Sequence, residues 1–573
     1  MKKPYSIAAR PRKHDPHARR PIMSGGIERV PKLCGADIEL GNFILGDDSN
    51  GGTGRHASRL LLSEIEGLPQ GSRWYQGGSY HSQDWGRKFL KENGGCAYID
   101  LDHLELAMPE VRSAHDHVAC WHAMLRIAHT AQEAANAKLE NGKKIVALVN
   151  NSDGLGNSYG SHLDFLITRR AWDNVFCRRM HHMLFLASYQ ASSIVFTGQG
   201  KVGSENEMPP VPYQISQRAD FFEVLVSADT TVRRPIVNCR DEALCGNSYD
   251  YDSGNVPALN MARLHVIFFD NTLCHVASLL KVGVMQIILA MIEGERVNHE
   301  MILDKPLEAV WRWSHDPSLQ ARTRLITGQQ TTAVELQLRF LEEAVRFVEG
   351  GGCEGIVPNA QTILSLWADT LTKLKANDFD ALAPRIDWIL KSSIIRRAMD
   401  QHPNLTWASP ELKRLDLMYS SLHDGLYWLY ERNGLVERVV TDAQIERFVH
   451  EPPEDSRAWT RAMLLRRANV EEVDSVDWDE MAFWLRNEDG WPSRTKLRLA
   501  NPLAFAKADT EAVFQRTATI QELLDELGTE LNCRSASKLQ VVLPQPPHAI
   551  SNPLHSVETA VNATNEITQH REE

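Results

Sequence analysis

Three segments of the chain place acidic or histidine side chains at every second position: Asp37–Glu39, Tyr98–Asp102 and His162–Asp164. In a β-strand, residues i and i+2 point to the same face, so each segment would present its polar groups to one side of a sheet. Carboxylates gathered on one face repel one another unless a cation lies between them. Such oxygen ligands suit Mg²⁺, which binds carboxylates together with water and substrate phosphates. The alternative is that each strand shows its acids to water, and the residues alone leave both interpretations open.

Glu105 follows the second segment with the opposite parity. On one continuous strand it would face away from Tyr98 and Asp100. We therefore expect Glu105 to join them only if the chain bends sharply near 102–103.

A set of arginines offers the opposite charge. Arg218 lies in the segment SQRAD, and three more arginines, Arg240 among them, follow in RRPIVNCRDE at 233–242. A guanidinium group matches phosphate oxygens through two parallel hydrogen bonds and can hold a transferred phosphoryl group. Ion pairs with the acidic residues nearby explain the same arginines equally well.

Composition narrows the function classes. The chain has 573 residues and a net charge of −12, with 74 acidic and 62 basic side chains. Nucleic-acid binders usually carry the opposite balance, so we expect no nucleic-acid partner. The longest apolar run, 282–292, is too short to span a bilayer, so we expect no membrane partner. Nine scattered cysteines without a C-x-x-C pair indicate a reducing cytoplasm.

Other catalytic or metal motifs are weak. The histidine and cysteine clusters at 115–122 and 177–182 do not supply a four-ligand zinc set. No cysteine-protease signature is present. The acidic segments therefore remain the main candidates for chemistry.

Hydrophobic periodicity predicts the elements that position these groups. Strands are expected at 37–45, 97–106, 145–150, 193–197 and 264–270, and helices at 59–65, 114–141, 277–293, 332–349 and 361–376. This order indicates an α+β fold with a mainly antiparallel sheet and one helical face. We divide the chain into a flexible basic extension (1–32), a main domain (33–452), a small C-terminal domain (453–544) and a disordered tail (545–573).

Taken in order, these segments resemble the sequence blocks of the Pup ligase and Pup deamidase/depupylase family. The similar blocks are GADIEL at 35–40, NGGCAYIDLDHLELAMPE at 93–110, NNSDGLGNSYGSHLDFL at 150–166, SQRAD at 216–220, RRPIVNCRDE at 233–242, RLHVIFFDN at 263–271 and LKVG at 280–283. The similarity covers roughly residues 33–510.

The resemblance implies a glutamine-synthetase-like fold, in which a curved antiparallel sheet binds ATP (or ADP) with Mg²⁺ and a small C-terminal domain closes on it. By position, Asp100 aligns with the catalytic aspartate of the family. The implied metal-binding residues are Asp37, Glu39, Tyr98, Glu105 and His162. The implied nucleotide-binding residues are Arg218, Arg240 and Trp478.

Two activities occur in the family, and several segments are closer to the deamidase/depupylase branch. These are the spacing from Asp100 to Glu105 with the ending AMPE, DPSL at 316–319, LTWASPEL at 405–412 and GLYWLYERNG at 425–434. The resemblance thus implies a hydrolase acting on the C-terminal Gln or Glu side chain, or the isopeptide bond, of Pup or a Pup-like small protein and its lysine conjugates. The alternatives are an ATP-consuming ligase that joins a tag's C-terminal glutamate to an amine, and a tag-binding pseudoenzyme.

The chain also departs from the family pattern. Asp37 is one methylene shorter than the glutamate expected there, and Cys96 stands where an arginine is expected to contact phosphate. The family's DEPHAD reads DEALCG here, at 241–246, and an insertion follows at 247–260. These departures suggest a divergent member with a related tag or peptide, or one with weakened nucleotide binding.

Overall fold

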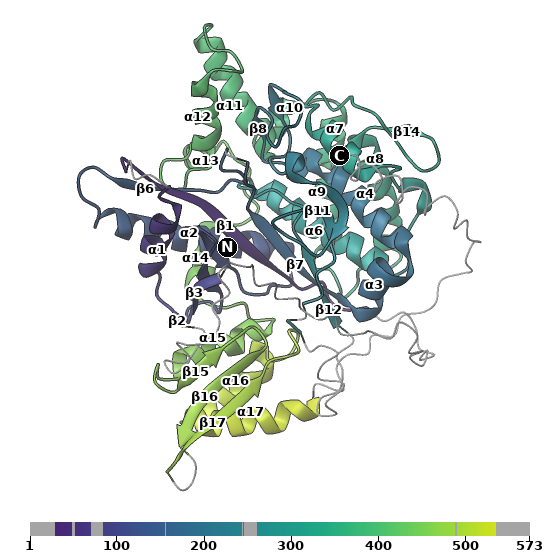
Figure 1. Ribbon diagram of the computed structural model, residues 1–573. Helices are drawn as coiled ribbons and strands as arrows, with labels where there is room; N and C mark the ends of the chain where they lie inside the picture. Colours follow the sequence, from purple (N-terminus) through teal and green to yellow (C-terminus); the bar gives the residue numbers. More distant parts are fainter. Residues whose placement is uncertain are drawn as a thin grey trace, which may run out of the picture.

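The structure, a computed structural model, describes residues 29–47, 52–69, 84–154, 156–242, 244–245, 261–486 and 490–534. The predicted extension at 1–32 lies almost wholly outside the described residues, and the predicted tail at 545–573 and the insertion at 247–260 lie wholly outside them. Figure 1 shows a central sheet with helices packed on it and a smaller C-terminal unit, coloured green to yellow, to one side.

The central sheet has eight strands among the described residues, in the order β12-β7-β1-β5-β4-β3-β2, with β6 pairing to the far half of β1. All of these pairs are antiparallel. The strands are β1 (Cys34–Leu45), β2 (Leu68–Pro69), β3 (Asp84–Phe89), β4 (Cys96–Asp100), β5 (His103–Ala107), β6 (Lys144–Leu148), β7 (Ser161–Thr168) and β12 (Met261–Val266). The predicted α+β class with an antiparallel sheet is confirmed.

Strand β1 shows how the sequence pattern separates two faces of the sheet. Ala36, Ile38 and Leu40 are completely or almost completely buried in the main hydrophobic core. Asp37 and Glu39 alternate with them and therefore point to the opposite face. The alternation in this segment thus buries apolar side chains under the helices and leaves the acids on the open face.

The region predicted as one strand at 97–106 is a hairpin. Strands β4 and β5 pair directly, with Asp100 opposite His103, and Leu101 adopts a positive φ of 52° in the turn between them. A two-residue turn with a left-handed backbone matches the twist of the paired strands. The sharp bend that Glu105 requires is therefore present, and Glu105 pairs with Tyr98 across the hairpin.

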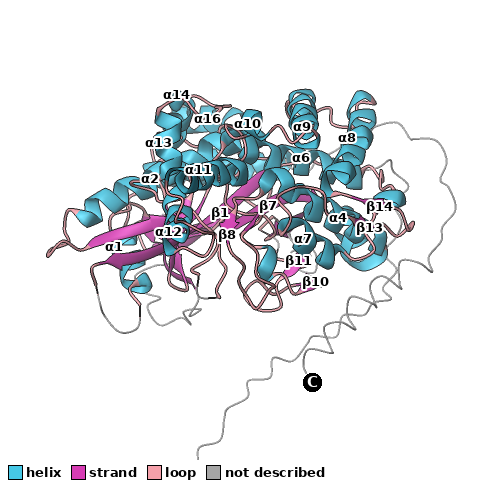
Figure 2. Ribbon diagram, turned by 90° about the horizontal axis from the view of Figure 1, so that it is seen from above, coloured by secondary structure: helices cyan, strands magenta, loops and turns pink. Residues whose placement is uncertain are grey.

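Helices cover the apolar face of the sheet (Figure 2). The main ones are α2 (Ala114–Asn136), α4 (Met180–Thr197), α6 (His275–Glu293), α8 (Ala333–Glu349) and α9 (Ala360–Lys375). Four of them agree with the predicted helices, and α1 (Gly54–Ser63) begins earlier than the predicted helix at 59–65.

The predicted strand at 193–197 is wrong, because this segment forms the last turns of α4. Its β-branched residues favour a strand locally. The hydroxyl of Thr197 instead donates to the carbonyl of Ser193 within the helix, and the whole segment is buried in the core. Tertiary packing thus overrides the local preference.

Helix α6 is the core helix of the protein. Among the described residues it is the one helix long and apolar enough to cross a membrane, and every residue in it is buried inside the protein. Its position at the centre of a large core explains why this helix is apolar on all sides.

The C-terminal unit has a core of its own. It consists of α15 (Arg457–Arg467), the antiparallel strands β15 (Val473–Val476), β16 (Glu480–Arg486) and β17 (Pro492–Arg498), and the helices α16 (Lys507–Arg516) and α17 (Ile520–Arg534). Apolar residues such as Phe483 and Leu523 pack together there and reach Phe89 and Tyr98 of the main sheet. We propose a domain boundary near residue 452, between α14 (Asp442–His450) and α15.

Candidate active site

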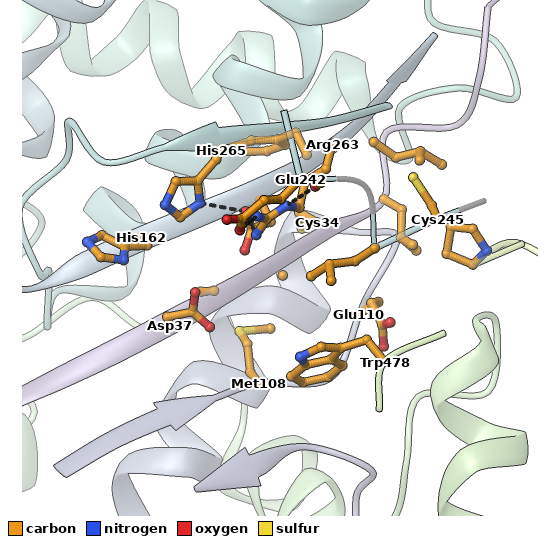
Figure 3. A pocket seen from close by; sticks show the side chains of 18 of the residues that line it. Cys34, Asp37, Met108, Glu110, His162, Glu242, Cys245, Arg263, His265 and Trp478 are labelled. Atoms are coloured by element: carbon orange, nitrogen blue, oxygen red, sulfur yellow. Dashed lines mark hydrogen bonds and ion pairs between the residues drawn. The ribbon is translucent and has the colours of Figure 1, made fainter. Parts of the chain in front are cut away.

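A cavity of about 580 Å³ lies between the open face of the sheet and the C-terminal unit. Strands β1, β4, β5 and β7 contribute Asp37, Asp100, Glu105 and His162 to its lining. The C-terminal unit contributes Trp478 (Figure 3). Pockets of this size hold small molecules, and their position between two units is a common one for ligand sites.

Strand register brings the predicted acidic residues together. Glu39 lies opposite Glu105, and Glu105 lies opposite Tyr98, so the three side chains form one row across β1, β5 and β4. Asp37 lies opposite His162 in the neighbouring row. Residues paired in this way share a face of the sheet.

Two triads of candidate ligand atoms result from this register. Asp37, Glu105 and His162 offer atoms within 4.8 Å of one another, and so do Glu39, Asp100 and Glu105. Glu105 belongs to both triads. Tyr98 differs from these acidic and histidine residues because its hydroxyl donates a hydrogen bond to Oε1 of Glu105, at 2.6 Å.

The electrostatics of this cluster fit a cation. Burial raises the pKa values of Asp37, Glu39 and Glu105 well above their usual range, and the neighbouring carboxylates raise them further. The second oxygen of Glu105 is buried without a hydrogen-bond partner among the described residues. Buried carboxylates are expected to be paired or to bind metal. These residues therefore fit a divalent cation such as Mg²⁺.

His162 is suited to the same role. Burial, then the neighbouring His265 and the arginines around it, lower the pKa of His162 well below 6.5, so its imidazole is neutral near pH 7. One of its ring nitrogens lies 3.7 Å from a carboxylate oxygen of Glu39. A neutral imidazole has a lone pair for a metal ion.

Asp164 has a different position from the other acids. Its Oδ1 accepts from Nη1 of Arg263 at 3.0 Å and lies 2.9 Å from Nδ1 of His265. Burial raises the pKa of Asp164, but attraction to Arg263 and His265 outweighs it and lowers the pKa overall. Asp164 is therefore an ionised carboxylate that already has protein partners, Arg263 and His265.

Only one of the two predicted nucleotide-binding arginines lines the cavity. Arg240 lines the cavity, whereas Arg218 is completely buried and is not among the lining residues. Nη1 of Arg218 donates to the carbonyl of Tyr159 at 2.6 Å, while Nε and Nη2 are buried without a hydrogen-bond partner among the described residues. Burial, followed by repulsion from Arg234, lowers the pKa of Arg218 to about 9. The sequence alone could not show that Arg240 lines the cavity and Arg218 does not.

Trp478 enters the cavity from the C-terminal unit, and an ion-pair network that the sequence analysis missed holds it there. Arg461 lies 4.7 Å from the centre of the Trp478 ring and donates from Nη1 to its carbonyl at 3.2 Å. Glu110, which follows β5, accepts from Nη2 of Arg461 at 2.6 Å and from Nε of Arg457 at 2.8 Å. The signal available in the sequence was the i, i+4 spacing of the two arginines on one helix.

Glu110 thus makes an electrostatic contact between the two units. Burial alone would raise its pKa, but attraction to Arg461 and Arg457 outweighs burial and lowers the pKa to about 2. Both arginines are nearly inaccessible to solvent. Glu110 is therefore ionised over the physiological pH range.

An antiparallel sheet with acidic side chains on its open face, closed by a small C-terminal unit, defines the glutamine-synthetase-like class of enzymes. Within that class, the Pup-ligase protein family matches residues 63–482. The chain belongs to this family.

Relatives carry both names used in the family. The chain is 33% identical over 439 residues to a depupylase of Acidothermus cellulolyticus, covering 76% of this chain and 82% of the relative. It is 36% identical over 406 residues to a Pup–protein ligase of Acidimicrobium ferrooxidans, covering 69% and 84%. A Pup deamidase/depupylase of Mycolicibacterium smegmatis is 32% identical over 437 residues, covering 76% and 82%.

Two solved structures have the same fold. The Pup ligase PafA in complex with Pup superposes with a TM-score of 0.68 at 24% identity, covering 89% of this chain and 98% of that one. PafA in complex with ADP gives a TM-score of 0.62 at 26% identity, covering 76% and 90%. The expected glutamine-synthetase-like fold is confirmed.

Proposed function

We propose that this protein is an ATP- and Mg²⁺-dependent hydrolase of the Pup deamidase/depupylase type. Its substrate would be the C-terminal Gln or Glu side chain, or the isopeptide bond to lysine, of Pup or a Pup-like small protein. The observation that carries this proposal is the convergence of Asp100, Glu39 and Glu105 within 4.8 Å beside a cavity that Trp478 closes. The depupylase relatives cover more of this chain than the ligase relative, 76% against 69%.

Within the triad of Glu39, Asp100 and Glu105, Asp100 is the acid that is most open to the cavity. Glu39 and Glu105 are 6% and 2% exposed, whereas Asp100 is half-buried at the end of β4 and lines the cavity. We therefore assign the catalytic carboxylate to Asp100. It would attack the carbonyl carbon itself or take a proton from the attacking water.

The other polar residues would bind the cofactors. Asp37, Glu39, Glu105 and His162 would hold Mg²⁺, which when bound would supply positive charge for the carboxylates and for phosphate oxygens. Tyr98 would orient Glu105 through its hydrogen bond. Arg240 and Trp478 would contact the nucleotide in the cavity. Arg218, which does not line the cavity, would act indirectly by holding the loop that carries Tyr159.

The solution environment proposed for this reaction is the reducing cytoplasm. The eight cysteines that the structure describes are all free thiols. Free, buried thiols are typical of proteins in a reducing compartment.

A ligase is the second candidate, because the Pup–protein ligase relative has the higher identity, 36%. Intact-mass spectrometry separates the two. Glutamine-ended Pup, glutamate-ended Pup and a Pup–lysine conjugate would each be incubated with the protein and Mg·ATP. Deamidation or release of the lysine supports the hydrolase. Attachment of glutamate-ended Pup with matching ADP release shows a ligase, and no reaction with intact Pup binding shows a pseudoenzyme.

Asp100→Asn tests the assigned catalytic residue against a matched control. Asp102→Asn makes the same change two residues away, on an exposed side chain that pairs with Arg55. We expect Asp100→Asn to abolish turnover with nucleotide binding retained, and Asp102→Asn to keep normal activity. An active Asp100→Asn protein would show that the assignment is wrong. Label found in the Asp100 carboxylate after a single turnover in ¹⁸O-water would show direct attack, with water opening the resulting mixed anhydride at the aspartyl carbon.

A further inference from the structure

A second group of metal-ligating side chains lies on the helical side of the sheet, away from the acidic cluster. His129 and Glu133 are four residues apart near the end of α2. His423 lies between α12 (Pro410–Tyr419) and α13 (Leu426–Arg432), 294 positions further along the chain. The three residues offer ligand atoms that all lie within 4.8 Å of one another. Ligands four residues apart share one side of a helix, as in helical zinc motifs.

Strand β6 anchors both parts of this group. On one side, Nε2 of Gln132 on α2 donates to the carbonyl of Ile145 at 2.9 Å. On the other side, the backbone amide of Leu422 donates to the carbonyl of Ala147 at 2.9 Å. Leu422 directly precedes His423 in the chain. The strand therefore holds His423 beside the last turns of α2 without the help of a ligand.

The distances between the ligand atoms match those around a tetrahedral metal ion. Nε2 of His129 lies 3.4 Å from Nδ1 of His423 and 3.8 Å from Oε1 of Glu133. A zinc ion bound at about 2.0–2.2 Å holds its ligand atoms about 3.3–3.5 Å apart. A hydrogen bond between the two rings, with an ion pair to Glu133, is the alternative explanation of these distances.

The other ring nitrogen of His423 faces a carboxylate. Nε2 of His423 lies 3.6 Å from Oδ1 of Asp424. This negative charge favours the tautomer that carries its proton on Nε2, which leaves the lone pair on Nδ1. Histidines that bind metal usually direct their second ring nitrogen toward a carboxylate or carbonyl group in the same way.

The group is accessible and borders a small cavity. The side chains of His129, Glu133 and His423 are all partly exposed, so an ion can enter from solvent. His129 and His423 also line a cavity of about 200 Å³. Among the described residues, this cavity shares no lining residue with the larger cavity beside the acidic cluster. The group is therefore separate from the candidate active site.

We propose that His129, Glu133 and His423 bind a transition-metal ion of the Zn²⁺ class, with water in the fourth position. Two imidazoles and one carboxylate suit Zn²⁺ rather than Mg²⁺, which prefers oxygen ligands. The bound ion would connect α2 to the segment between α12 and α13. This inference does not depend on the proposed function, because the nucleotide and Mg²⁺ are assigned to the other cavity.

The experiment measures Zn²⁺ binding by calorimetry to the untagged chain in saturating MgCl₂, for the wild type, His129→Ala, His423→Ala and a control, His450→Ala. His450 and Glu446 form the same i, i+4 pair on α14, with Nε2 and Oε1 3.0 Å apart. Among the described residues, no third ligand is grouped with that pair.

We expect the wild type to bind one Zn²⁺ that both His129→Ala and His423→Ala bind at least about a hundredfold more weakly, since even residues that only support a ligand cost up to that factor. His450→Ala should bind like the wild type. Zn²⁺ held by the acidic cluster or by other histidines cancels in the comparison, because these residues are the same in all four proteins.

Co²⁺ absorption shows directly whether residue 423 is a ligand. His423→Cys should keep metal binding, because the sulfur of cysteine, like Nδ1 of histidine, lies close to Cβ, and thiolate is a strong ligand of such ions. Bound Co²⁺ should then show a thiolate-to-cobalt band in the near ultraviolet that the wild type lacks. A thermal midpoint in EDTA checks that each variant is folded.

Three results would overturn the proposal. One is Zn²⁺ binding by His129→Ala or His423→Ala that equals that of the wild type. Another is an equal loss of binding in His450→Ala, which would show that the exposed histidines chelate Zn²⁺ without a defined site. The third is a folded His423→Cys protein that shows no thiolate-to-cobalt band.

Discussion

The acidic cluster should make the metal-free protein less stable as the pH rises. Asp37 has an ordinary pKa of 3.8, and burial followed by repulsion from Asp164 raises it to about 8 in the folded protein. Between these two values the folded state binds a proton that the unfolded chain has released. Its contribution to stability therefore decreases from pH 4 upward and levels off above pH 8.

Asp37→Asn isolates this contribution, because asparagine keeps the shape without the charge. One pKa unit corresponds to about 1.36 kcal/mol, so a rise from 3.8 to about 8 corresponds to at most about 5 kcal/mol at pH 8. The repulsion is shared with neighbouring carboxylates, so we expect Asp37→Asn to stabilise the metal-free protein by about 2 to 5 kcal/mol at pH 8. At pH 5 the expected gain is only about 1 kcal/mol.

Thermal unfolding in EDTA and in saturating MgCl₂, at pH 5 and pH 8, measures this effect. The difference between variant and wild type cancels the pH dependence of the many buried histidines, which both proteins share. Added Mg²⁺ should raise the midpoint of the wild type and reduce the advantage of Asp37→Asn. The exposed Asp102→Asn should show no such dependence. An Asp37→Asn protein that melts at or below the wild-type temperature in EDTA at pH 8 would refute the reasoning.

Three further outcomes are expected. Glu110→Gln leaves the buried Arg457 and Arg461 without their counter-charge, which should cost about 3 kcal/mol and expose the C-terminal unit to limited proteolysis; an unchanged cleavage pattern would contradict this. Gly160→Ala would place a Cβ 1.8 Å from the side-chain nitrogen Nδ2 of Asn151 at a φ of 139°, so denaturant unfolding should show a loss of about 2 kcal/mol or more, and wild-type stability would speak against the described loop. Trp478→Leu should weaken Mg·ADP binding by about tenfold in calorimetry without lowering the thermal midpoint by more than a few degrees, and an unchanged affinity would remove Trp478 from the nucleotide site.

The pattern of charges also explains why the site lies where it does. The face of the sheet opposite the helices is only partly covered, by the C-terminal unit, so polar groups can face the cavity there. The same face is where β1, β4, β5 and β7 bring carboxylates close enough to destabilise one another. A cluster of this kind lowers the stability of the folded protein and is retained for binding, which is usual for active sites.

The sequence by itself determined which acidic side chains share one face of a strand. The spacing of two residues in Asp37–Glu39 and in Tyr98–Asp100 places side chains on one face of any strand, because the backbone repeats every second residue. The alternation with Ile38 and Leu40 likewise determined which face would be buried. These are local properties of the chain, so they could be predicted before the fold was known.

Only the tertiary structure decided how these segments meet. Glu105 joins the site because the chain turns at Leu101, and Arg218 does not line the cavity because its side chain is completely buried. His129 and His423 lie together because α2 and the segment before α13 both bond to β6. Turns, burial and such bonds depend on contacts between residues far apart in the chain, and periodicity within a single segment contains no information about such contacts.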